Sequence, residues 1–395
     1  MVNNILFLTL KVFAATGGIE KVCRVAGKAL YEMSITRSVT CQVYSMYDKQ
    51  KDADENKYFP AEIFRGFGTA KVKFIFDALA KGKKSDTVVL SHINLLLVGW
   101  MIKKLSPSTR IILFAHGIEV WGTLGSRKKM MLQCCDMIIP VSQFTSQKLQ
   151  ELHGIAPEKC RVLNNCLDPF LPLSKERNGN WPLRQQYGFS NDNTILFTLT
   201  RLSSKERYKG YDRVLHAMVR LSAFYPGIRY FLAGSYDMQE KVHLDELIKK
   251  LELQDKVTIA GFIAEEDLLA HFSMTDIYVM PSIKEGFGIV FIEAMYYGLP
   301  VIAGNKDGSV DALCNGELGL LVDPLDTVAI ENAIEKILIN KNAFMPNREL
   351  LMKHFSYEQY KLQLELILDP ALQSKIQNTE SKKATVAYKV NSYTL

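Results

Sequence analysis

Several features that define common classes of protein are missing from this 395-residue sequence. Its seven cysteines are scattered and odd in number, and none forms a Cys-x-x-Cys pair, so neither a disulfide framework nor a zinc site is expected. No apolar run reaches the ~18–20 residues of a membrane-spanning helix. The N-terminal MVNNILFLTL has no charged residue before its short apolar run, which favours a buried strand over a signal peptide. The expected location is the reducing cytoplasm.

The charge is shared unevenly between the two halves. Residues 1–170 hold 23 Lys and Arg against 14 Asp and Glu, whereas the remainder holds 25 against 28. Much of the basic excess lies in FRGFGTAKVKFIFDALAKGKK, residues 64–84. Such a stretch can face an anionic membrane or an anionic ligand, although an ordinary solvated helix face has the same pattern. No DNA- or RNA-binding motif accompanies it, so nucleic acid is not an expected partner.

Short apolar runs alternate with amphipathic stretches along the whole chain. Apolar runs rich in β-branched residues are typical of strands buried on both faces of a parallel sheet. Their alternation with helices predicts an α/β fold. The expected strands are 4–10, 38–44, 87–92, 110–116, 136–142, 161–165, 194–201, 228–234, 256–262, 276–282, 300–304 and 319–323.

The alternation stops once, at a stretch with several prolines and no periodicity, as is typical of a linker. Because 395 residues are too many for one ordinary core, we expect two sequential parallel-sheet domains. A last helix is predicted to start at Ser356, which with Gln359 has the spacing of a capping box. The expected units are a first domain at 1–170, a linker at 171–193, a second domain at 194–355, a helix at 356–369 and a mobile tail at 370–395.

Thr16-Gly17-Gly18 follows the first expected strand and opens a helix. In open parallel sheets ligands bind beyond the carboxyl ends of the strands, and a glycine-flanked helix N-terminus can accept an anion. The stretch is not G-x-G-x-x-G, and no acidic residue stands out ~20 positions later at a strand end, which disfavours a dinucleotide cofactor. A tight turn alone explains these glycines equally well.

Other polar residues also stand at expected strand ends. His116 closes RIILFAH and His92 closes TVVLSH, although histidines at such positions are more often hydrogen-bonded caps. Arg201 ends a strand of the second half and Lys209 precedes a helix, which places two cations where a diphosphate can bind. Lys205 is the alternative cation, and a solvated charge cluster is the alternative to a site.

The stretch KEGFGIVFIEAM places Glu285 and Glu293 around residues that otherwise belong in a protein interior. A buried carboxylate is costly without a partner, so these acids have either protein partners or a ligand. If a helix starts near Phe287, Gly286 and Gly288 leave its first amides open to an anion. Eight helical residues span ~12 Å, too far for two carboxylates that act on one glycosidic bond. The spacing fits an elongated ligand such as a sugar nucleotide, or two structural salt bridges.

With Arg201, Lys209, Glu285 and Glu293 in this order, the sequence resembles the retaining GT-B glycosyltransferases of glycosyltransferase family four. EGFGIVFIE matches the Glu-x7-Glu pattern of that family, and the supporting stretches cover nearly the whole chain. They are GGIEKV, AHG, VSQFTS, TRL, YFLAGS, VTIAGFI, MPSIKEGFG, EAMYYGLPVIAG and GLLVDP. The resemblance implies two Rossmann-like domains facing each other across a cleft, with the last helix crossing back to the first domain.

The resemblance also implies roles for individual residues. Arg201 and Lys209 bind the donor diphosphate, Glu285 holds hydroxyls of the donor sugar, Glu293 accepts from the ribose hydroxyls, and His116 contacts the donor sugar. The other residues implied in donor binding are Gly17, Gly18, Phe262, Ile263, Gly286, Phe287, Gly288 and Ile289. Ser142 and His92 are expected on the acceptor side. Two departures from the family pattern are Thr200, where a glycine is usual, and the long gap from Arg201 to Lys209, which leaves Lys205 open.

The implied reaction moves a hexosyl unit from a UDP- or GDP-sugar to a hydroxyl of a glycan or lipid-linked acceptor, with retention, in bacterial surface polysaccharide or glycoconjugate synthesis. Cations and helix amides stabilise the leaving phosphate. Asp52-Ala53-Asp54 has the metal–nucleotide pattern of another glycosyltransferase class but lies in a charged loop, so no metal and no other cofactor is expected. The basic first domain is expected to hold the acceptor and to contact the inner membrane face.

Three alternatives remain open from the sequence. A nucleotide-sugar epimerase or a phosphorylase has the same fold class, but the Glu-x7-Glu pair disfavours the first and the length disfavours the second. A non-catalytic nucleotide-sugar-binding subunit that recruits an active partner fits the same residues. A dehydrogenase is disfavoured by the missing dinucleotide motif.

Overall fold

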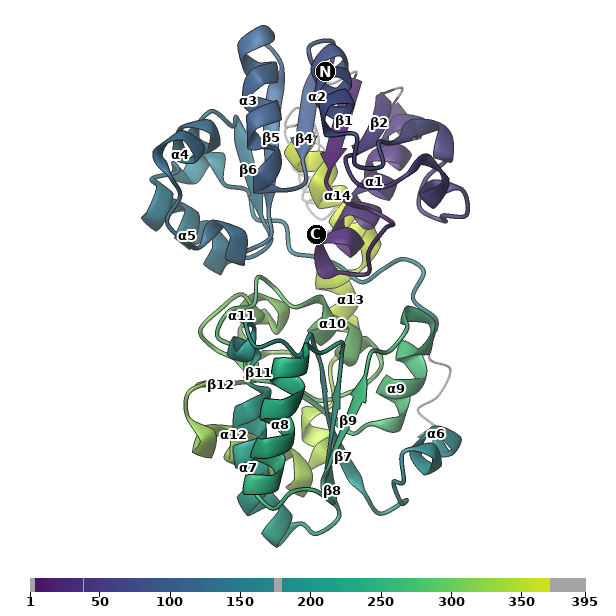
Figure 1. Cartoon of the computed structure of the whole chain (residues 1–395), viewed down its shortest axis with the longest axis vertical. Coiled ribbons are helices and arrows are strands. Elements are labelled where there is room, and N and C mark those ends of the chain that lie inside the picture. Colours follow the sequence, from purple (N-terminus) through teal and green to yellow (C-terminus); the bar gives the residue numbers. More distant parts are fainter. Residues whose placement is uncertain (1–3, 38, 174–179, 370–395) are drawn as a thin grey trace, which may run out of the picture.

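The computed structural model describes residues 4–37, 39–173 and 180–369 (Figure 1). Its strands form two six-stranded sheets in which every pairing is parallel. The order is β3-β2-β1-β4-β5-β6 in the first sheet and β12-β11-β10-β7-β8-β9 in the second. The predicted α/β class with two parallel sheets is therefore confirmed. The expected tail at 370–395 lies outside the described residues.

Each sheet takes its strands from one half of the chain. The first contains β1 (Asn4–Thr9), β2 (Thr40–Ser45), β3 (Phe64–Gly66), β4 (Thr87–Leu90), β5 (Arg110–Ala115) and β6 (Met137–Pro140). The second contains β7 (Thr194–Leu199), β8 (Ile228–Ala233), β9 (Val257–Gly261), β10 (Ile277–Met280), β11 (Val301–Gly304) and β12 (Leu320–Val322).

One expected strand is wrong and one strand was not predicted. The segment 161–165 runs beside β6, with the Leu163 amide donating to the Pro140 carbonyl, but only an isolated bridge at Cys160 forms and no strand results. The strand β3 is three residues long, too short to show a period, and lies within the basic stretch at 64–84.

Helices connect the strands, and short 3₁₀ turns lie in several loops. The α-helices are α1 (Gly18–Arg37), α2 (Lys71–Gly82), α3 (Leu96–Leu105), α4 (Ser126–Gln133), α5 (Gln143–His153), α6 (Trp181–Gln186), α7 (Tyr211–Phe224), α8 (Met238–Lys250), α9 (Leu268–Met274), α10 (Ile289–Tyr296), α11 (Ser309–Ala312), α12 (Thr327–Ile339), α13 (Arg348–Phe355) and α14 (Tyr357–Leu368). The 3₁₀ turns are η1 (Gln50–Ala53), η2 (Ala61–Ile63), η3 (Ile93–Leu95), η4 (Ile118–Val120), η5 (Pro157–Lys159), η6 (Arg207–Lys209), η7 (Glu265–Asp267), η8 (Cys314–Gly316) and η9 (Lys341–Phe344).

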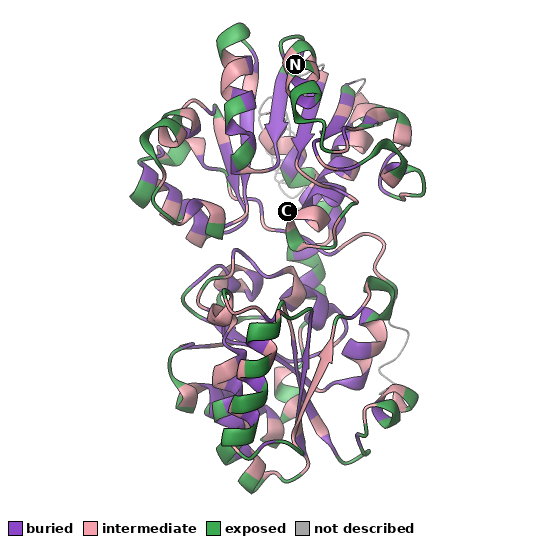
Figure 2. Ribbon diagram, viewed as in Figure 1, coloured by how far each residue is buried: buried purple, intermediate pink, exposed green. Residues whose placement is uncertain are grey.

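Alternate residues of each central strand pack into different cores. In β1, Ile5 and Phe7 join a core with residues of α1 and α14, whereas Leu6 and Leu8 join one with residues of α2 and α3. In the second half, β7 divides its side chains in the same way between α9, α10 and α13 on one face and α7, α8 and α12 on the other. Figure 2 shows most strands as buried, whereas β9 is of intermediate burial. This burial on both faces explains why the strands lack polar alternation.

The last helix lies against the first half of the chain. Helix α14 begins after Ser356, whose hydroxyl accepts the Gln359 amide as the predicted cap requires. The Tyr357 hydroxyl then donates to the Glu32 carboxylate of α1 at 2.9 Å. The expected linker at 171–193 contains a helix that was not predicted, α6.

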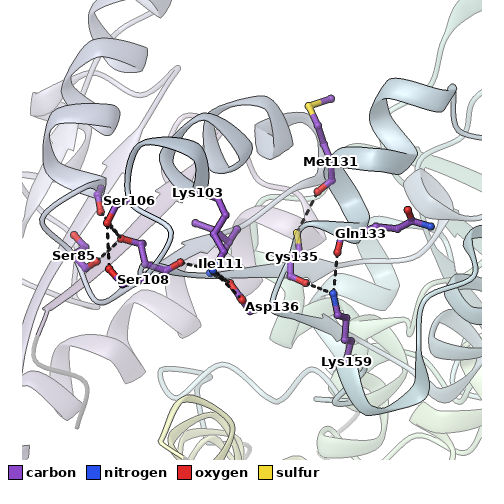
Figure 3. A network of polar contacts seen from close by, with 12 residues as sticks. Ser85, Lys103, Ser106, Ser108, Ile111, Met131, Gln133, Cys135, Asp136 and Lys159 are labelled. Carbon is purple, nitrogen blue, oxygen red and sulfur yellow. Dashed lines mark hydrogen bonds and ion pairs between the residues drawn. The ribbon is translucent and has the colours of Figure 1, made fainter.

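A polar network fixes the amino ends of β5 and β6 (Figure 3). The Asp136 carboxylate accepts the Ile111 amide at 2.7 Å and the Lys103 ammonium at 2.9 Å. Lys159 donates to the carbonyls of Gln133 and Cys135. Because this network lies at the amino ends of the strands, it leaves the carboxyl ends free for a site. Within the described ranges, no helix is both long and apolar enough to span a bilayer.

Candidate functional site

The loops at the carboxyl ends of the two sheets touch each other. A Cβ added to Gly286, after β10, would lie 1.8 Å from the carbonyl oxygen of His116, after β5. Gly117 beside it has φ +132°, a conformation that favours glycine. A second contact joins α5 of the first half to α11 of the second: the Gln143 amide donates to Asp311 Oδ1 at 2.8 Å. Direct backbone contact thus requires glycine at position 286.

A second loop supports the Glu285 loop. The Glu285 amide donates to Asp307 Oδ2 at 2.7 Å, and the Gly308 amide donates to the Glu285 carbonyl at 2.8 Å. Burial raises the pKa of Asp307 to about 6, although hydrogen bonds from Ser282 and Ser309 act in the opposite direction. Asp307 therefore determines where the Glu285 backbone lies.

Helix α10 begins two residues later than predicted, at Ile289. Gly288 precedes it with φ +86°, and no side chain caps this N-terminus. The first amides of α10 are thus without a side-chain cap directly after the Glu285 loop, which is the arrangement expected for anion binding.

Glu285 is paired with a lysine from the loop before α7. Its Oε2 lies 2.5 Å from Lys209 Nζ, and both side chains are largely buried. Burial by itself lowers the pKa of a lysine, but the Glu285 carboxylate outweighs it and the pKa of Lys209 is raised. The Lys205 side chain is exposed, and its backbone amide donates a hydrogen bond to Ser203 Oγ. The structure therefore brings Lys209, and not Lys205, to Glu285.

Cations gather around Tyr208, a residue that was not predicted. Lys209 Nζ lies 5.7 Å and Lys284 Nζ 5.8 Å from its ring centroid. Arg201 is 73% exposed and pairs with Glu206 at 2.7 Å, so it does not touch Glu285 directly. An exposed arginine near buried Lys209 provides positive charge at the open edge of this site.

The two predicted histidines are held by backbone groups. His116 Nε2 lies 2.7 Å from the Ser91 carbonyl oxygen, which can only accept, so Nε2 carries the proton. The His116 amide donates to Glu119 Oε1 at 2.5 Å. His92 Nδ1 accepts the Asn94 amide at 3.1 Å and caps η3. These contacts fix both rings near the carboxyl ends of β4 and β5.

Glu293 has a partner in the other half of the chain. Its Oε1 lies 2.6 Å from Lys21 Nζ of α1, and its side chain is 4% exposed. Lys21 also lies 3.8 Å from Glu265, which pairs with Arg24 at 3.5 Å. Burial opposes the charge of Lys21, but Glu293 and then Glu265 raise its pKa. This ion pair explains how the apolar helix tolerates a carboxylate.

The remaining predicted donor residues occupy loop positions at the same edge. Gly17 and Gly18 lie at the start of α1, whose third residue carries the acid Glu20. Phe262 follows β9 and is 65% exposed, whereas Ile263 is buried. Phe287 is buried against the Phe355 ring, with centroids 5.5 Å apart, so it supports the loop from below.

Two other predictions gain a structural context. Ser142 is fully buried, and its hydroxyl caps α5 by accepting the Thr145 amide; its place on the acceptor side stays a prediction. Asp52 lies in η1 and accepts the Lys49 amide. Within the described ranges, no three His, Cys, Asp or Glu side chains form a group able to hold a metal ion.

Besides Tyr208, sequence reasoning missed Lys21 and Asp307. Lys21 lies in the quoted GGIEKV stretch, but its partner is 272 positions away in the sequence. Asp307 follows β11, a position at the ligand-binding edge that could have drawn attention to it.

Two family models match the chain. The model described as Glycosyltransferase Family 4 matches residues 16–169, and the model described as Glycosyl transferases group 1 matches residues 180–354. The two matched ranges contain the predicted donor-site residues.

Curated relatives match part of the chain. Mannosylfructose-phosphate synthase of Agrobacterium fabrum is 30% identical over 205 residues, which are 50% of this chain and 44% of that protein. The GDP-mannose-dependent alpha-(1-6)-phosphatidylinositol monomannoside mannosyltransferase of Mycobacterium tuberculosis is 27% identical over 251 residues, 60% of this chain and 63% of that protein. The match thus spans less than two thirds of either relative.

Solved structures resemble the whole architecture. Anabaena Alr3699/HepE in complex with UDP and glucose has a TM-score of 0.74 at 20% identity, covering 93% of this chain and 99% of that one. Sucrose-phosphate synthase from Thermosynechococcus elongatus has a TM-score of 0.72 at 22% identity, covering 94% and 100%. At these identities the likeness shows the fold, and it confirms the predicted GT-B arrangement.

Proposed function

Because the chain belongs to glycosyltransferase family 4, we propose that it transfers a hexosyl unit from a nucleotide sugar to an acceptor hydroxyl and retains the anomeric configuration. The observation that carries this proposal is the buried Glu285–Lys209 pair beside the uncapped N-terminus of α10. A cation and free amides suit a diphosphate, and an adjacent carboxylate suits sugar hydroxyls.

The proposed reaction is a displacement at the anomeric carbon. The acceptor oxygen forms a bond to this carbon while the bond to the diphosphate oxygen breaks on the same face. The acceptor proton passes to the departing phosphate oxygen. Lys209, Arg201 and the first amides of α10 stabilise the negative charge on the nucleoside diphosphate, so this proposal requires no metal and no other cofactor. His116, held by the Ser91 carbonyl, orients the donor sugar from the other sheet.

A UDP- or GDP-linked hexose is the proposed donor. A relative is named for GDP-mannose and a structural neighbour contains UDP, and both compounds carry the diphosphate that the site suits. Exposed Phe262 offers an aromatic face beyond β9 on which either base can stack. Glu293 is proposed to accept from the ribose hydroxyls with lone pairs that Lys21 does not use.

The acceptor is proposed to be a glycan or lipid-linked molecule of bacterial surface polysaccharide or glycoconjugate synthesis, reached at an anionic membrane. Helix α2 supports the membrane contact because Val72 and Phe76, one turn apart, are each 68% exposed. Lys73, Lys83 and Lys84 are exposed on the same stretch. Exposed apolar residues flanked by lysines are typical of interfacial helices.

A transfer assay tests the proposal. Radiolabelled UDP- and GDP-hexoses are incubated with the full chain and extracted bacterial membrane lipids, and label in the organic phase is counted. We expect one donor to label the lipid fraction and the Glu285→Ala variant to abolish the signal. Tight binding of UDP or GDP without transfer from any donor would instead favour a non-catalytic nucleotide-sugar-binding subunit.

A further inference from the structure

A cavity lies on the first half of the chain, outside the predicted donor residues. Its volume is about 460 Å³, within the range of small-molecule sites. It opens between the start of α3 and the start of α4, two helices that pack against each other. We name it the α3–α4 pocket. Its lining residues are Ile93, Asn94, Leu96, Leu97, Gly125, Ser126, Arg127, Lys128 and Met131.

One wall of the α3–α4 pocket is positive. Arg127 is exposed, and no carboxylate pairs with it in the part of the chain that the structure describes. Lys128 Nζ donates to Asn94 Oδ1 at 3.1 Å, which points the ammonium across the mouth between the two helices. No Asp or Glu is among the described residues that line the pocket. Two cations without a counter-ion suit an anionic group, and an arginine suits a phosphate in particular.

The other wall is apolar. Ile93 and Leu96 are buried beneath it, while Leu97 is 51% exposed. Met131 lines the same wall, and its neighbour Met130 is 47% exposed. An exposed leucine beside flexible methionines gains free energy when an apolar chain covers it, at about 25 cal/mol per Å². The pocket therefore matches a ligand with both a charged and an apolar part.

The pocket adjoins the residues that face the proposed donor. Asn94, in its wall, is the residue whose amide His92 accepts. Burial lowers the pKa of His92; Glu119 opposes this effect, and His116 and Lys128 add to it. His92 Nδ1 and Lys128 Nζ both contact Asn94, so His92 lies beside the positive wall of the pocket. A ligand in the pocket thus has its polar end next to His92.

We propose that the α3–α4 pocket binds the acceptor, and that the acceptor is an amphiphile with a phosphate next to its apolar chain. This inference rests on the proposed function. Arg127 and Lys128 hold the phosphate, Leu97 and Met131 cover the start of the apolar chain, and the acceptor hydroxyl extends past His92 toward His116. Helix α3, which lines the pocket, also packs against α2, the helix proposed to meet the membrane.

Binding of octyl phosphate to the full chain tests the proposal by titration calorimetry below its micelle concentration. 1-Octanol and inorganic phosphate are titrated alongside, since each carries only half of the proposed chemistry. The test variant is Arg127→Ala with Lys128→Ala. The matched control is Lys129→Ala, which removes a cation from the same helix outside the pocket. UDP and GDP binding is measured for every variant.

We expect octyl phosphate to bind at least tenfold more tightly than octanol or phosphate. The double variant should lose about tenfold or more of this affinity, since each charge-assisted hydrogen bond contributes ~1.5–3 kcal/mol. Lys129→Ala should bind like the wild type. Equal affinity of wild type and double variant, or phosphate binding as tight as octyl phosphate, would overturn the proposal. If UDP or GDP still binds in that case, the pocket assignment alone has failed; absence of nucleotide binding would count against the proposed function itself.

Discussion

Lys21 Nζ of α1 lies 2.6 Å from Glu293 Oε1 of α10, and this contact joins the two halves of the molecule. The Glu293 side chain is 4% exposed and that of Lys21 16%. The acid that we propose for the donor ribose is therefore held in place by a cation of the other half before a nucleotide arrives. A donor bound at Glu293 would contact both halves at once, which gives a physical basis for closure of the two domains on binding.

Alanine substitutions of the two glutamates of KEGFGIVFIEAM are predicted to affect different steps, one the nucleotide affinity and the other the turnover. Glu293→Ala removes the proposed ribose contact and should weaken UDP or GDP binding about tenfold or more, because a hydrogen bond to a charged group contributes ~1.5–3 kcal/mol. Glu285→Ala removes the proposed sugar contact and should lower turnover while nucleotide affinity stays near that of the wild type. Calorimetry and the transfer assay separate the two effects. Equal nucleotide affinity in wild type and Glu293→Ala would contradict the ribose assignment.

Lys21→Met tests the contact between the halves. The change leaves Glu293 buried without a cation, a loss that typically costs about 3–5 kcal/mol. We expect lower thermal stability and a higher KM for the donor. Lys21→Arg keeps the charge and should retain most of both properties.

The control for this variant is Lys28→Met on the same helix. Lys28 pairs with Glu32 at 2.6 Å within α1, so its loss does not affect the site. If Lys21→Met and Lys28→Met changed the donor KM equally, the link from Lys21 to the nucleotide site would be wrong.

The raised pKa of Asp307 predicts that the free energy of unfolding depends on pH. Its pKa in the folded chain is about 6, against about 4 for an unfolded aspartate. Between these values the folded state binds a proton that the unfolded state has lost, so this stabilising contribution is complete below pH ~4 and is lost as the pH rises through ~6. Asp307→Asn cannot titrate, yet its amide oxygen can still accept the Glu285 amide.

Urea unfolding at several pH values between 4.5 and 7.5 measures this effect. The free energy of unfolding of the wild type, relative to Asp307→Asn, should fall by about 2–3 kcal/mol from the acidic to the neutral end. A difference that does not change with pH would refute the assignment.

Membrane contact through α2 is tested by charge reversal. Lys83→Glu with Lys84→Glu should reduce binding to anionic phosphatidylserine-containing vesicles at least tenfold, since each lysine near such a surface contributes ~1 kcal/mol. Lys249→Glu with Lys250→Glu reverses two exposed lysines on α8 in the other half and serves as the control. Co-sedimentation measures both. Unchanged vesicle binding of the first variant would rule out this face.

The local pattern of apolar residues in the sequence was enough to predict most strands of the fold. Buried runs such as 110–116 and 194–201 predicted β5 and β7 because strands covered on both faces need apolar residues throughout. The segment 161–165 was wrongly predicted as a strand: it contains two apolar residues followed by two asparagines, and the bridge at Cys160 does not extend into a ladder. Residues Phe64–Gly66 were missed because three residues show no period.

The chemistry of the site was most readable where its residues lie in one motif. Glu285, Gly286 and Gly288 are close in sequence, and their chemistry is readable there. Lys21 was not predicted as the partner of Glu293, because the two residues are 272 positions apart and the placement of the two halves decides that contact. The preference for Lys209 over Lys205 likewise depends on how the loop before α7 turns, which the residue types alone do not specify.

The central claim is that the chain captures a nucleoside diphosphate sugar between its two halves without a metal. Calorimetric titration of the purified chain with UDP, GDP, ADP and NAD in the presence of EDTA tests it most directly. The account predicts that UDP or GDP binds and that NAD does not. Binding of NAD alone would contradict it, and nucleotide binding that disappears in EDTA would contradict the metal-independent site.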